Sequence, residues 1–332
     1  MRYEEIIKSI KNKIFSPIYF LHGEEGFFID EICNLIDQNV LTEGEKDFNQ
    51  SVVYGKDTDI GTIITMAKRF PMMSSHQVIL VKEAQHLKQL NLLESYIDSP
   101  QKSTILVFCY KYKKIDGRLA VAKKIKKNHI LFDSKKIYDN QTPNWIENHI
   151  RSIGVSITPP ASRMLSEHLG NDLSRISNEV QKLLITTKKG ETITEDDIQD
   201  KIGISKDYNV FELQNALGLK DITKANKIIF YFAANPKDHP LVMIIPILYN
   251  YFSNIAVIHT LQDKSPRSIA SALGINPYFV NAISSAARYY SYAKLVRIIG
   301  YLREYDAKAK GVDNPYTSGG DLLKELIYKI LH

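Results

Sequence analysis

The chain has 332 residues, of which 44% are hydrophobic and 24% are charged, the composition of a globular protein of two or three domains. Its two cysteines, Cys33 and Cys109, lie in apolar segments, so we expect no disulfide framework and a reducing, cytoplasmic location. The N-terminal segment MRYEEIIKSIKNKIF has no apolar stretch of signal-peptide length, so export is not indicated.

The net charge of +6 is distributed unevenly along the chain. Residues 101–136 carry eleven Lys and Arg residues against Asp116 and Asp133, a local charge of +9 that leaves −3 for the remainder. Such a segment indicates contact with nucleic acid or an acidic partner, although Lys-rich helices are more often solvated surface. The candidate residues for contact with DNA or another subunit are Lys123, Lys124, Lys126 and Lys127.

Residues 1–137 alternate strand-like and helix-like segments, a pattern that predicts a mostly parallel sheet covered by helices. Most of the strands are continuous apolar runs, as expected when both faces of a sheet are buried. The predicted strands are 18–21, 51–54, 78–81, 104–109 and 129–132, and the predicted helices are 27–40, 59–69, 87–96 and 118–126.

The stretch PIYFLHGEEGFFIDE at 17–31 has the order of strand, glycine-bearing turn and helix that is typical of a phosphate-binding loop. Such a loop needs several glycines, whose N–H groups converge on the anion, and then Lys and Ser or Thr. Only Gly23 and Gly26 are present, and Glu24 and Glu25 lie between them. Because carboxylates repel an anion, we expect a nucleotide-binding architecture that does not bind nucleotide. A plain strand-to-helix turn with Glu at the helix N-terminus explains the pattern equally well.

The segment VILVKE at 78–83 lies where such a fold would carry the acidic residues that bind magnesium and activate water. Lys82 replaces the first of these acids, and Glu83 remains. Both parts of the expected nucleotide site, the turn at 23–26 and the acidic position at Lys82, are therefore altered in one chain. This favours a protein that has the fold but does not hydrolyse ATP. The alternative is that neither segment ever formed such a site.

From residue 138 onward the pattern is wholly helical. We predict a small helical lid domain at 138–206, in which Thr142 caps the first helix and Thr194 with Asp197 begins the last one. A second helical domain, rich in Tyr, Phe and Ile, is predicted at 207–332.

Residues 239–262 contain no Asp, Glu, Lys or Arg over a length that could span a bilayer. Polar residues such as Asn250 and Asn254 would be costly in lipid, so we predict a buried helix and no membrane contact.

The sequence contains no HExxH, CxxC, G-x-S-x-G or calcium-loop pattern, and its nine histidines are scattered. We therefore assign no catalytic residue, no metal site and no cofactor.

Phe70, Pro71, Met72 and Met73 form a short connection before the strand at 78–81. Pro71 ends the preceding helix, so the connection presents large apolar side chains. Such side chains can insert into a hydrophobic pocket of a partner, where Met adapts its shape and Phe supplies contact area. The alternative is that they pack beneath the sheet as core.

Taken together, these segments resemble the delta subunit of the bacterial DNA polymerase III clamp loader over nearly the whole chain. The resemblance is carried by five segments in the order of that family, namely 17–31, RFPMMSSHQVILVKEA at 69–84, LGNDLSRISNEVQKL at 169–183, YNVFEL at 208–213 and LREYDAKAKG at 302–311. It implies an AAA+-like module without ATPase activity at 1–137, a lid at 138–206 and an oligomerising helical collar at 207–332.

In that family the subunit binds the ring-shaped sliding clamp, beta, and holds one of its interfaces open, while the gamma or tau motor subunits hydrolyse ATP. Delta prime is a further implied partner, and primed DNA an indirect one. The resemblance places the clamp-binding element at Phe70, Pro71, Met72 and Met73, where relatives commonly carry Leu-Pro-Phe-Phe or a Leu-Phe pair. It implies a non-catalytic component of the polymerase holoenzyme, with clamp affinity left open by the two methionines.

Two other functions stay open at this point. An AAA+-type ATPase with a divergent phosphate loop predicts ATP binding that is lost when Gly23 or Glu83 is changed. A stand-alone nucleic-acid adaptor acting through residues 101–136 predicts steeply salt-dependent DNA binding without a partner.

Overall fold

The computed structural model describes residues 2–205, 207–314 and 316–332, so residues 1 and 206, which bound two of the predicted domains, lie outside the described residues. The chain divides into two compact units, Met1–Ile137 and Tyr138–His332. Each unit has its own hydrophobic core. The further division of the second unit into lid and collar stays a prediction.

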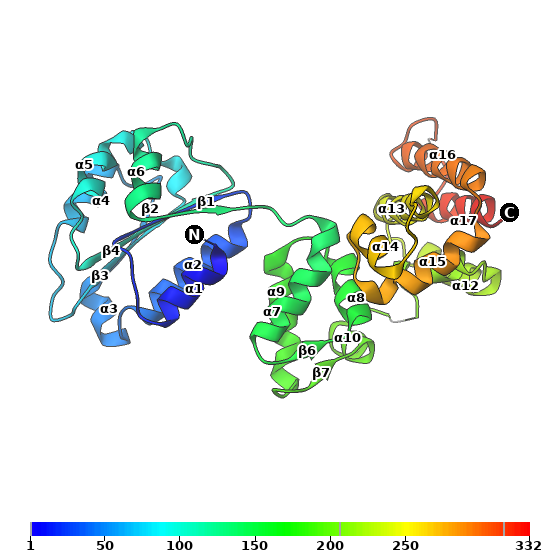
Figure 1. Ribbon diagram of the computed structural model, residues 1–332, viewed down its shortest axis with the longest axis horizontal. Helices are drawn as coiled ribbons and strands as arrows, with labels where there is room; N and C mark the ends of the chain where they lie inside the picture. Colours follow the sequence, from blue (N-terminus) through cyan, green and yellow to red (C-terminus); the bar gives the residue numbers. More distant parts are fainter. Residues whose placement is uncertain (1, 206, 315) are drawn as a thin grey trace. The chain divides into compact units, whose positions relative to one another are not determined.

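The first unit is a five-stranded sheet with helices on both faces (Figure 1). All strand pairs are parallel, and the strand order is β2-β3-β4-β1-β5. The five predicted strands are confirmed as β1 Ile18–Gly23, β2 Gln50–Tyr54, β3 Gln77–Lys82, β4 Thr104–Lys111 and β5 Ile130–Ser134.

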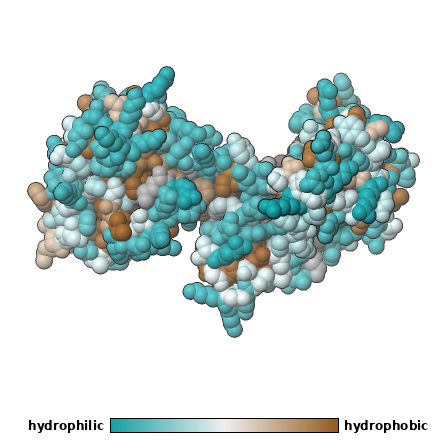
Figure 2. Space-filling view, in the orientation of Figure 1, coloured by the Kyte–Doolittle hydropathy of each residue, from teal (hydrophilic) through white to brown (hydrophobic). Residues whose placement is uncertain are grey.

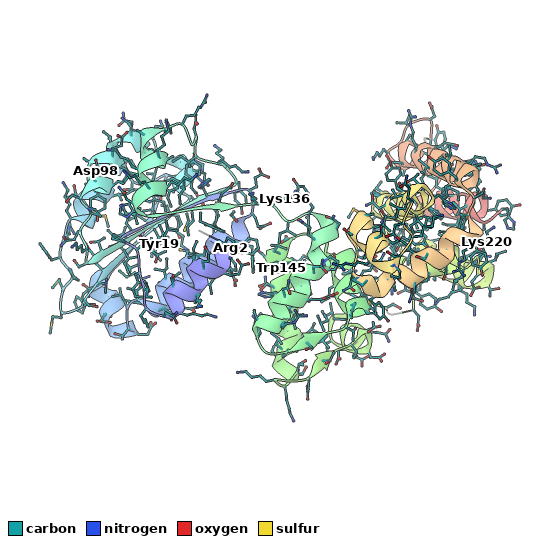
Figure 3. The ribbon with its side chains drawn as sticks, viewed as in Figure 1. Arg2, Tyr19, Asp98, Lys136, Trp145 and Lys220 are labelled. Atoms are coloured by element: carbon teal, nitrogen blue, oxygen red, sulfur yellow. The ribbon has the colours of Figure 1, made fainter. Side chains whose placement is uncertain are left out.

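Alternate side chains of the strands enter two cores, one on each face of the sheet. One core, which contains the Tyr19 side chain (Figure 3), is covered by α1 Tyr3–Lys11 and α2 Gly26–Asn39. The other contains Phe20 and is covered by α4 Ile60–Ala67, α5 Glu94–Asp98 and α6 Ala120–Asn128. A short helix, α3 Glu43–Asn49, leads into the edge strand β2. The buried apolar faces explain why the strands are continuous hydrophobic runs.

The predicted helix at 87–96 is wrong as a single element. The structure has two 3-10 turns, η1 Ala84–His86 and η2 Leu90–Leu93, followed by α5. Gln89 takes a left-handed conformation with φ 57°, which a continuous helix cannot accommodate. Helices α1 and α3 were not predicted.

The second unit is mainly helical. Its helices are α7 Thr142–Ser152, α8 Pro159–Leu169, α9 Leu173–Thr186, α10 Glu195–Ile202, α11 Val210–Gly218, α12 Ile222–Ala234, α13 Leu241–Thr260, α14 Pro266–Leu273, α15 Val280–Tyr289, α16 Tyr292–Ala309 and α17 Gly319–Leu331, with 3-10 turns η3 Asp139–Gln141 and η4 Pro277–Phe279. Trp145, on α7, is stacked on His149 with ring centroids 4.8 Å apart (Figure 3).

The prediction of a wholly helical segment after residue 138 is wrong in one place. Ser156–Ile157 (β6) pairs in parallel with Thr192–Ile193 (β7), because the loops before α8 and α10 run side by side and satisfy each other's backbone groups. The predicted cap at Thr142 is also wrong, since Gln141 is the N-cap and the Thr142 hydroxyl donates to the Tyr138 carbonyl oxygen.

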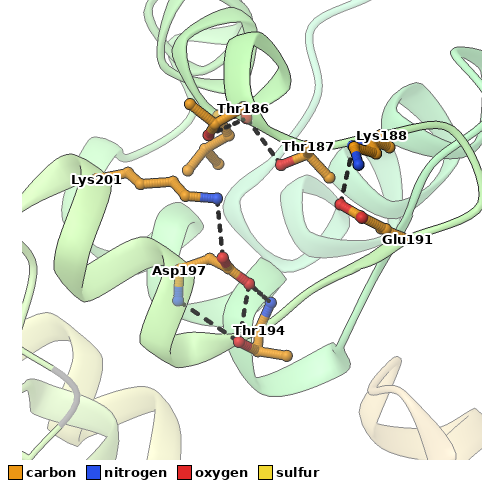
Figure 4. A network of polar contacts seen from close by, with 8 residues as sticks. Thr186, Thr187, Lys188, Glu191, Thr194, Asp197 and Lys201 are labelled. Carbon is orange, nitrogen blue, oxygen red and sulfur yellow. Dashed lines mark hydrogen bonds and ion pairs between the residues drawn. The ribbon is translucent and has the colours of Figure 1, made fainter.

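The predicted start of α10 is confirmed as a capping box (Figure 4). The carboxylate of Asp197 accepts hydrogen bonds from the backbone N–H and the hydroxyl of Thr194, both at 2.9 Å. Its other oxygen accepts from Lys201 at 2.9 Å, which ties the first turn of the helix to its last turn.

Helix α13 is long and apolar enough to cross a membrane by length and composition, and it is the one such helix among the described residues. It contributes eight buried side chains, including Leu248, Phe252 and Ile255, to the core of the second unit. Burial against protein explains its composition without a membrane.

Candidate functional site

The predicted nucleotide-site residues come together at one edge of the sheet. Strands β1 and β3 are parallel and separated only by β4, so their carboxyl ends lie at the same edge. The turn Gly23–Gly26 follows β1, and Lys82 and Glu83 lie at the end of β3. Ligands of open parallel sheets bind at this kind of edge.

The backbone N–H groups of the turn donate to oxygen atoms of the chain itself. Gly23 donates to the carbonyl oxygen of Lys113 at 2.9 Å, and Glu24 and Glu25 both donate to that of Ser134, at 2.9 and 3.2 Å. The Phe27 N–H donates to the Glu25 carboxylate at 3.1 Å. A phosphate-binding loop needs these groups directed at its anion.

Close packing also closes the turn. Gly23 has φ 133°, and a Cβ atom at this position would lie 2.1 Å from the carbonyl oxygen of Ser134. At Gly26 a Cβ atom would lie 3.3 Å from the ring of Tyr112. The glycines therefore allow the close approach of β5 and of the Tyr112 ring, and phosphate binding is not needed to explain them.

Two acidic residues of this region, Glu24 in the turn and Glu83 after β3, have cationic partners within the chain. Glu24 lies 3.3 Å from Lys114 Nζ, and Glu83 lies 3.2 Å from Lys56 Nζ. A hydrogen bond from the Cys109 thiol and, to a smaller extent, the Lys82 ammonium lower the pKa of the buried Cys33 thiol to about 7, against the opposing effect of burial. The Lys82 ammonium therefore lies among α2 and β4 side chains, where it disfavours a magnesium ion.

The connection between α4 and β3 displays three hydrophobic side chains to solvent. Phe70 is 77% exposed, Met72 is 63% exposed and Met73 is fully exposed, whereas Pro71 is half-buried. Hydrophobic atoms are visible at the left margin of the space-filling view (Figure 2), where the ribbon shows the connection before β3 (Figure 1). The alternative that these side chains pack beneath the sheet is therefore wrong.

Hydrogen bonds from polar side chains hold both ends of this connection. At the end of α4, the carbonyl oxygen of Ala67 accepts from the hydroxyls of Thr104 (2.8 Å) and Tyr96 (3.2 Å). The Gln77 amide donates to the carbonyl oxygen of Arg69 at 2.6 Å. In the middle, the Asn49 side chain makes two hydrogen bonds to the backbone of Met72. The exposed side chains thus project from a fixed backbone.

The lysines of α6 differ in their surroundings. Lys124 is paired with Asp98 at 2.7 Å and lies 3.5 Å from Glu94, and Asp98 is on α5 (Figure 3). Lys126 and Lys127 are exposed, and no ion pair joins either one to another described residue. These two lysines are available to an anionic partner.

A cavity of about 570 Å³ lies in the second unit between α8, α11, α13 and α15. On its wall the Arg163 guanidinium lies over the rings of Phe211 and Phe279 and donates to Glu167 at 3.0 Å. The second carboxylate oxygen of Glu167 is buried and has no hydrogen-bond partner among the described residues, and burial raises the pKa of this carboxyl. Sequence reasoning missed this pair because Arg163 and Glu167, four residues apart, read as an ordinary helix-surface pair.

No group of three or more His, Cys, Asp or Glu side chains suited to a metal ion is found among the described residues.

Comparison with known families matches residues 19–135 to "DNA polymerase III, delta subunit" and residues 207–317 to "DNA polymerase III delta subunit, C-terminal domain", together more than half of the chain. The chain is 28% identical over 318 residues to DNA polymerase III subunit delta of Bacillus subtilis, covering 92% of this chain and 91% of that one. It is 21% identical over 308 residues to the probable DNA polymerase III subunit delta of Aquifex aeolicus, covering 88% and 86%.

The solved structure of the Bacillus subtilis DNA clamp loader delta protein is similar over 99% of both chains, with a TM-score of 0.55 and 25% identity. A parallel sheet unit followed by a helical unit, together with these matches, defines a clamp-loader subunit. Within that class the chain belongs to the DNA polymerase III delta subunit family. It is therefore a component of DNA polymerase III.

Two residues of α3, one of them bonded to the 70–73 connection, were missed by sequence reasoning. Asn49 and Phe48 lie in α3, more than twenty residues earlier in the chain, and no local pattern links them to Met72. The one available signal in the sequence was the position of Asn49 between a charged helix and an apolar strand, and that position alone does not indicate contact with Met72.

Proposed function

We propose that the chain binds the sliding clamp through Phe70, Met72 and Met73 and holds one interface of the clamp open. The observation that carries this proposal is the exposure of three large apolar side chains on a backbone fixed at both ends. Exposed apolar clusters mark protein interaction sites, and a few such anchors supply most of the binding energy. The fixed backbone reduces the entropy lost on binding.

The mechanism is insertion of these side chains into a hydrophobic pocket of the clamp. Phe70 supplies rigid contact area, and the unbranched methionines adapt to the shape of the pocket. The sheet, buried on both faces, provides a rigid support, so that movement of the whole unit would be transmitted to the clamp.

The closed turn after β1 supports a role without ATP hydrolysis in this chain. Its N–H groups are bonded to Lys113, Ser134 and Glu25, so neighbouring gamma or tau motor subunits would supply the hydrolysis. In this proposal residues 138–206 act as the lid and residues 207–332 as the collar that contacts those subunits and delta prime. Primed DNA is an indirect partner, no membrane is involved, and the location is cytoplasmic.

The test is to mix the purified chain with the sliding clamp of its own organism and to separate the mixture by size exclusion, with and without ATP and magnesium. The proposal predicts co-elution in both conditions, because the binding residues are exposed without nucleotide. Separate elution at concentrations well above micromolar would contradict it. Titration of the chain alone with ATP and magnesium should show no binding. Binding that is lost on Gly23→Ala or Glu83→Gln would instead favour the ATPase.

A further inference from the structure

We infer that the clamp-binding surface continues from residues 70–73 onto helix α3, with Phe48 as a further contact residue and Asn49 as the residue that positions the connection. This inference rests on the proposed clamp binding and extends it to a segment that neither the sequence pattern nor the family resemblance indicates.

Asn49 is bonded to both backbone polar groups of Met72. Its side-chain N–H donates to the Met72 carbonyl oxygen at 2.9 Å, and its carbonyl oxygen accepts from the Met72 N–H at 2.6 Å. The same amide donates to the carbonyl oxygen of Glu45, one turn earlier in α3, at 3.1 Å. Asn49 is only 5% exposed, so these bonds are shielded from water. The Asn49 amide thus pairs with both the N–H and the carbonyl oxygen of Met72, as the backbone of a neighbouring strand does, and it holds Met72 in one conformation.

The connection requires such support because its conformation is not the preferred one. Met73 has φ 52°, the left-handed region that side chains other than Gly, Asn and Asp rarely adopt. Pro71 has no backbone N–H and forms no such tie. Hydrogen bonds from the backbone N–H and the hydroxyl of Thr42, with a smaller contribution from the Ser74 side chain, lower the pKa of Glu45. The contact with Ser74 gives α3 a second contact with the connection. Helix α3 is therefore the base on which residues 72–74 rest.

Phe48 lies on α3, the helix that makes these contacts. It follows Glu45 by three residues and directly precedes Asn49, so it lies within one turn of both residues of α3 that contact the connection. Its side chain is 70% exposed. A single exposed Phe is ordinary, but this one precedes Asn49, which is bonded to the exposed Met72. Phe48, Phe70, Met72 and Met73 thus belong to one hydrophobic surface made by two chain segments, and the partner it fits is the clamp.

The first experiment measures the clamp affinity of Phe48→Ala by surface plasmon resonance, using the full chain and the clamp of its own organism. We expect about 10-fold weaker binding and an unchanged thermal unfolding midpoint, because an exposed side chain is removed. The matched control is Tyr112→Ala, since Tyr112 is equally exposed at 70%. It follows the carboxyl end of β4, whereas the 70–73 connection precedes the amino end of the parallel strand β3, so the two lie at opposite ends of the strands. This control should keep the affinity of the unchanged protein.

The Met72→Ala, Met73→Ala double variant separates this inference from the proposed function. If the double variant loses affinity and Phe48→Ala keeps it, the extension onto α3 is wrong while clamp binding stands. If neither variant changes affinity, both are wrong.

The role of Asn49 is tested by a double-mutant cycle with Met73. Asn49→Ala removes both bonds to Met72, and we expect about 10-fold weaker binding. If Asn49 acts through the connection, the Asn49→Ala, Met73→Ala variant should bind little more weakly than the weaker single variant. If the fold-loss in clamp affinity of the double variant equals the product of the fold-losses of the two single variants, Asn49 acts independently of the connection and the assignment is overturned. Asn49→Asp keeps the shape but not the donor to the Met72 carbonyl oxygen, and it should not restore affinity.

Discussion

Ser134 and Glu25 form a reciprocal pair of hydrogen bonds. The Ser134 hydroxyl donates to the Glu25 carbonyl oxygen at 2.6 Å, and the Glu25 N–H donates to the Ser134 carbonyl oxygen at 3.2 Å. This pair joins the end of β5 to the turn after β1. The turn that would surround a phosphate in a working nucleotide site is therefore a structural joint of the sheet unit, and its glycines are required for packing.

The first prediction concerns Gly23→Ala, which should lower the free energy of unfolding by about 2–4 kcal/mol, since the new Cβ would overlap the Ser134 carbonyl and the residue keeps a strained φ. Chemical denaturation measures the change. Gly44→Ala is the control, because nothing lies within 4 Å of a Cβ there and Gly44 is within α3. It should be neutral or stabilising by up to about 1 kcal/mol. Equal stability of the two variants would contradict the close packing at Gly23.

The second prediction concerns the pH dependence of Glu167. Burial raises the pKa of this carboxyl in the folded protein, against the opposing effect of Arg163. Above the unfolded value of about 4.3, the unfolded chain binds fewer protons at this group than the folded chain does, so stability falls as the pH rises toward the folded pKa. The free energy of unfolding of the unchanged protein should fall relative to that of Glu167→Gln, by no more than about 1.4 kcal/mol per pH unit.

Denaturation of both proteins from about pH 4 to about pH 7 tests this sign. Glu43→Gln, which removes a carboxylate whose side chain is 91% exposed, is the control for the loss of one charge. A difference between the unchanged protein and Glu167→Gln that grows with pH would mean that the ion pair with Arg163 outweighs burial.

The third prediction separates the clamp-loader subunit from a stand-alone DNA-binding adaptor. The isolated chain should bind double-stranded DNA only in the non-specific range, with a Kd of about 10⁻⁴ to 10⁻⁶ M at physiological salt. Fluorescence anisotropy at several salt concentrations measures this binding. Lys126→Ala with Lys127→Ala should leave clamp binding unchanged, and Lys124→Ala is the control with a paired lysine. Nanomolar DNA binding that the double variant abolishes would favour the adaptor.

The sequence predicted the sheet well and the shorter elements poorly. The strands are buried on both faces, so each is an apolar run such as Val78–Val81 that can be recognised locally. Helix α3, EGEKDFN, has a single large apolar residue, Phe48, and that residue is exposed, so the helix has no hydrophobic face to reveal it. The β6–β7 pair is only two residues long in each strand and depends on contacts between distant loops.

The candidate sites show the same limit. Phe70, Met72 and Met73 could be identified because Pro71 ends the helix and marks an irregular connection. The hydrogen bonds from Asn49 and Gln77 that support these side chains could not be predicted, because they depend on how the sheet and its helices pack. The glycines of the turn suggested an altered phosphate loop. Only the structure shows which oxygen atoms of the chain accept hydrogen bonds from the N–H groups of Gly23, Glu24 and Glu25.

The most direct measurement is the affinity of the Met72→Ala, Met73→Ala variant for the sliding clamp, determined by surface plasmon resonance beside the unchanged chain and Tyr112→Ala. Both methionines are exposed, so the variant should keep the circular dichroism spectrum and unfolding midpoint of the unchanged chain. Loss of two anchoring side chains should cost about 2–4 kcal/mol, which is a roughly 30- to 1,000-fold weaker Kd. An affinity equal to that of the unchanged chain would show that the connection before β3 is not the clamp-binding element.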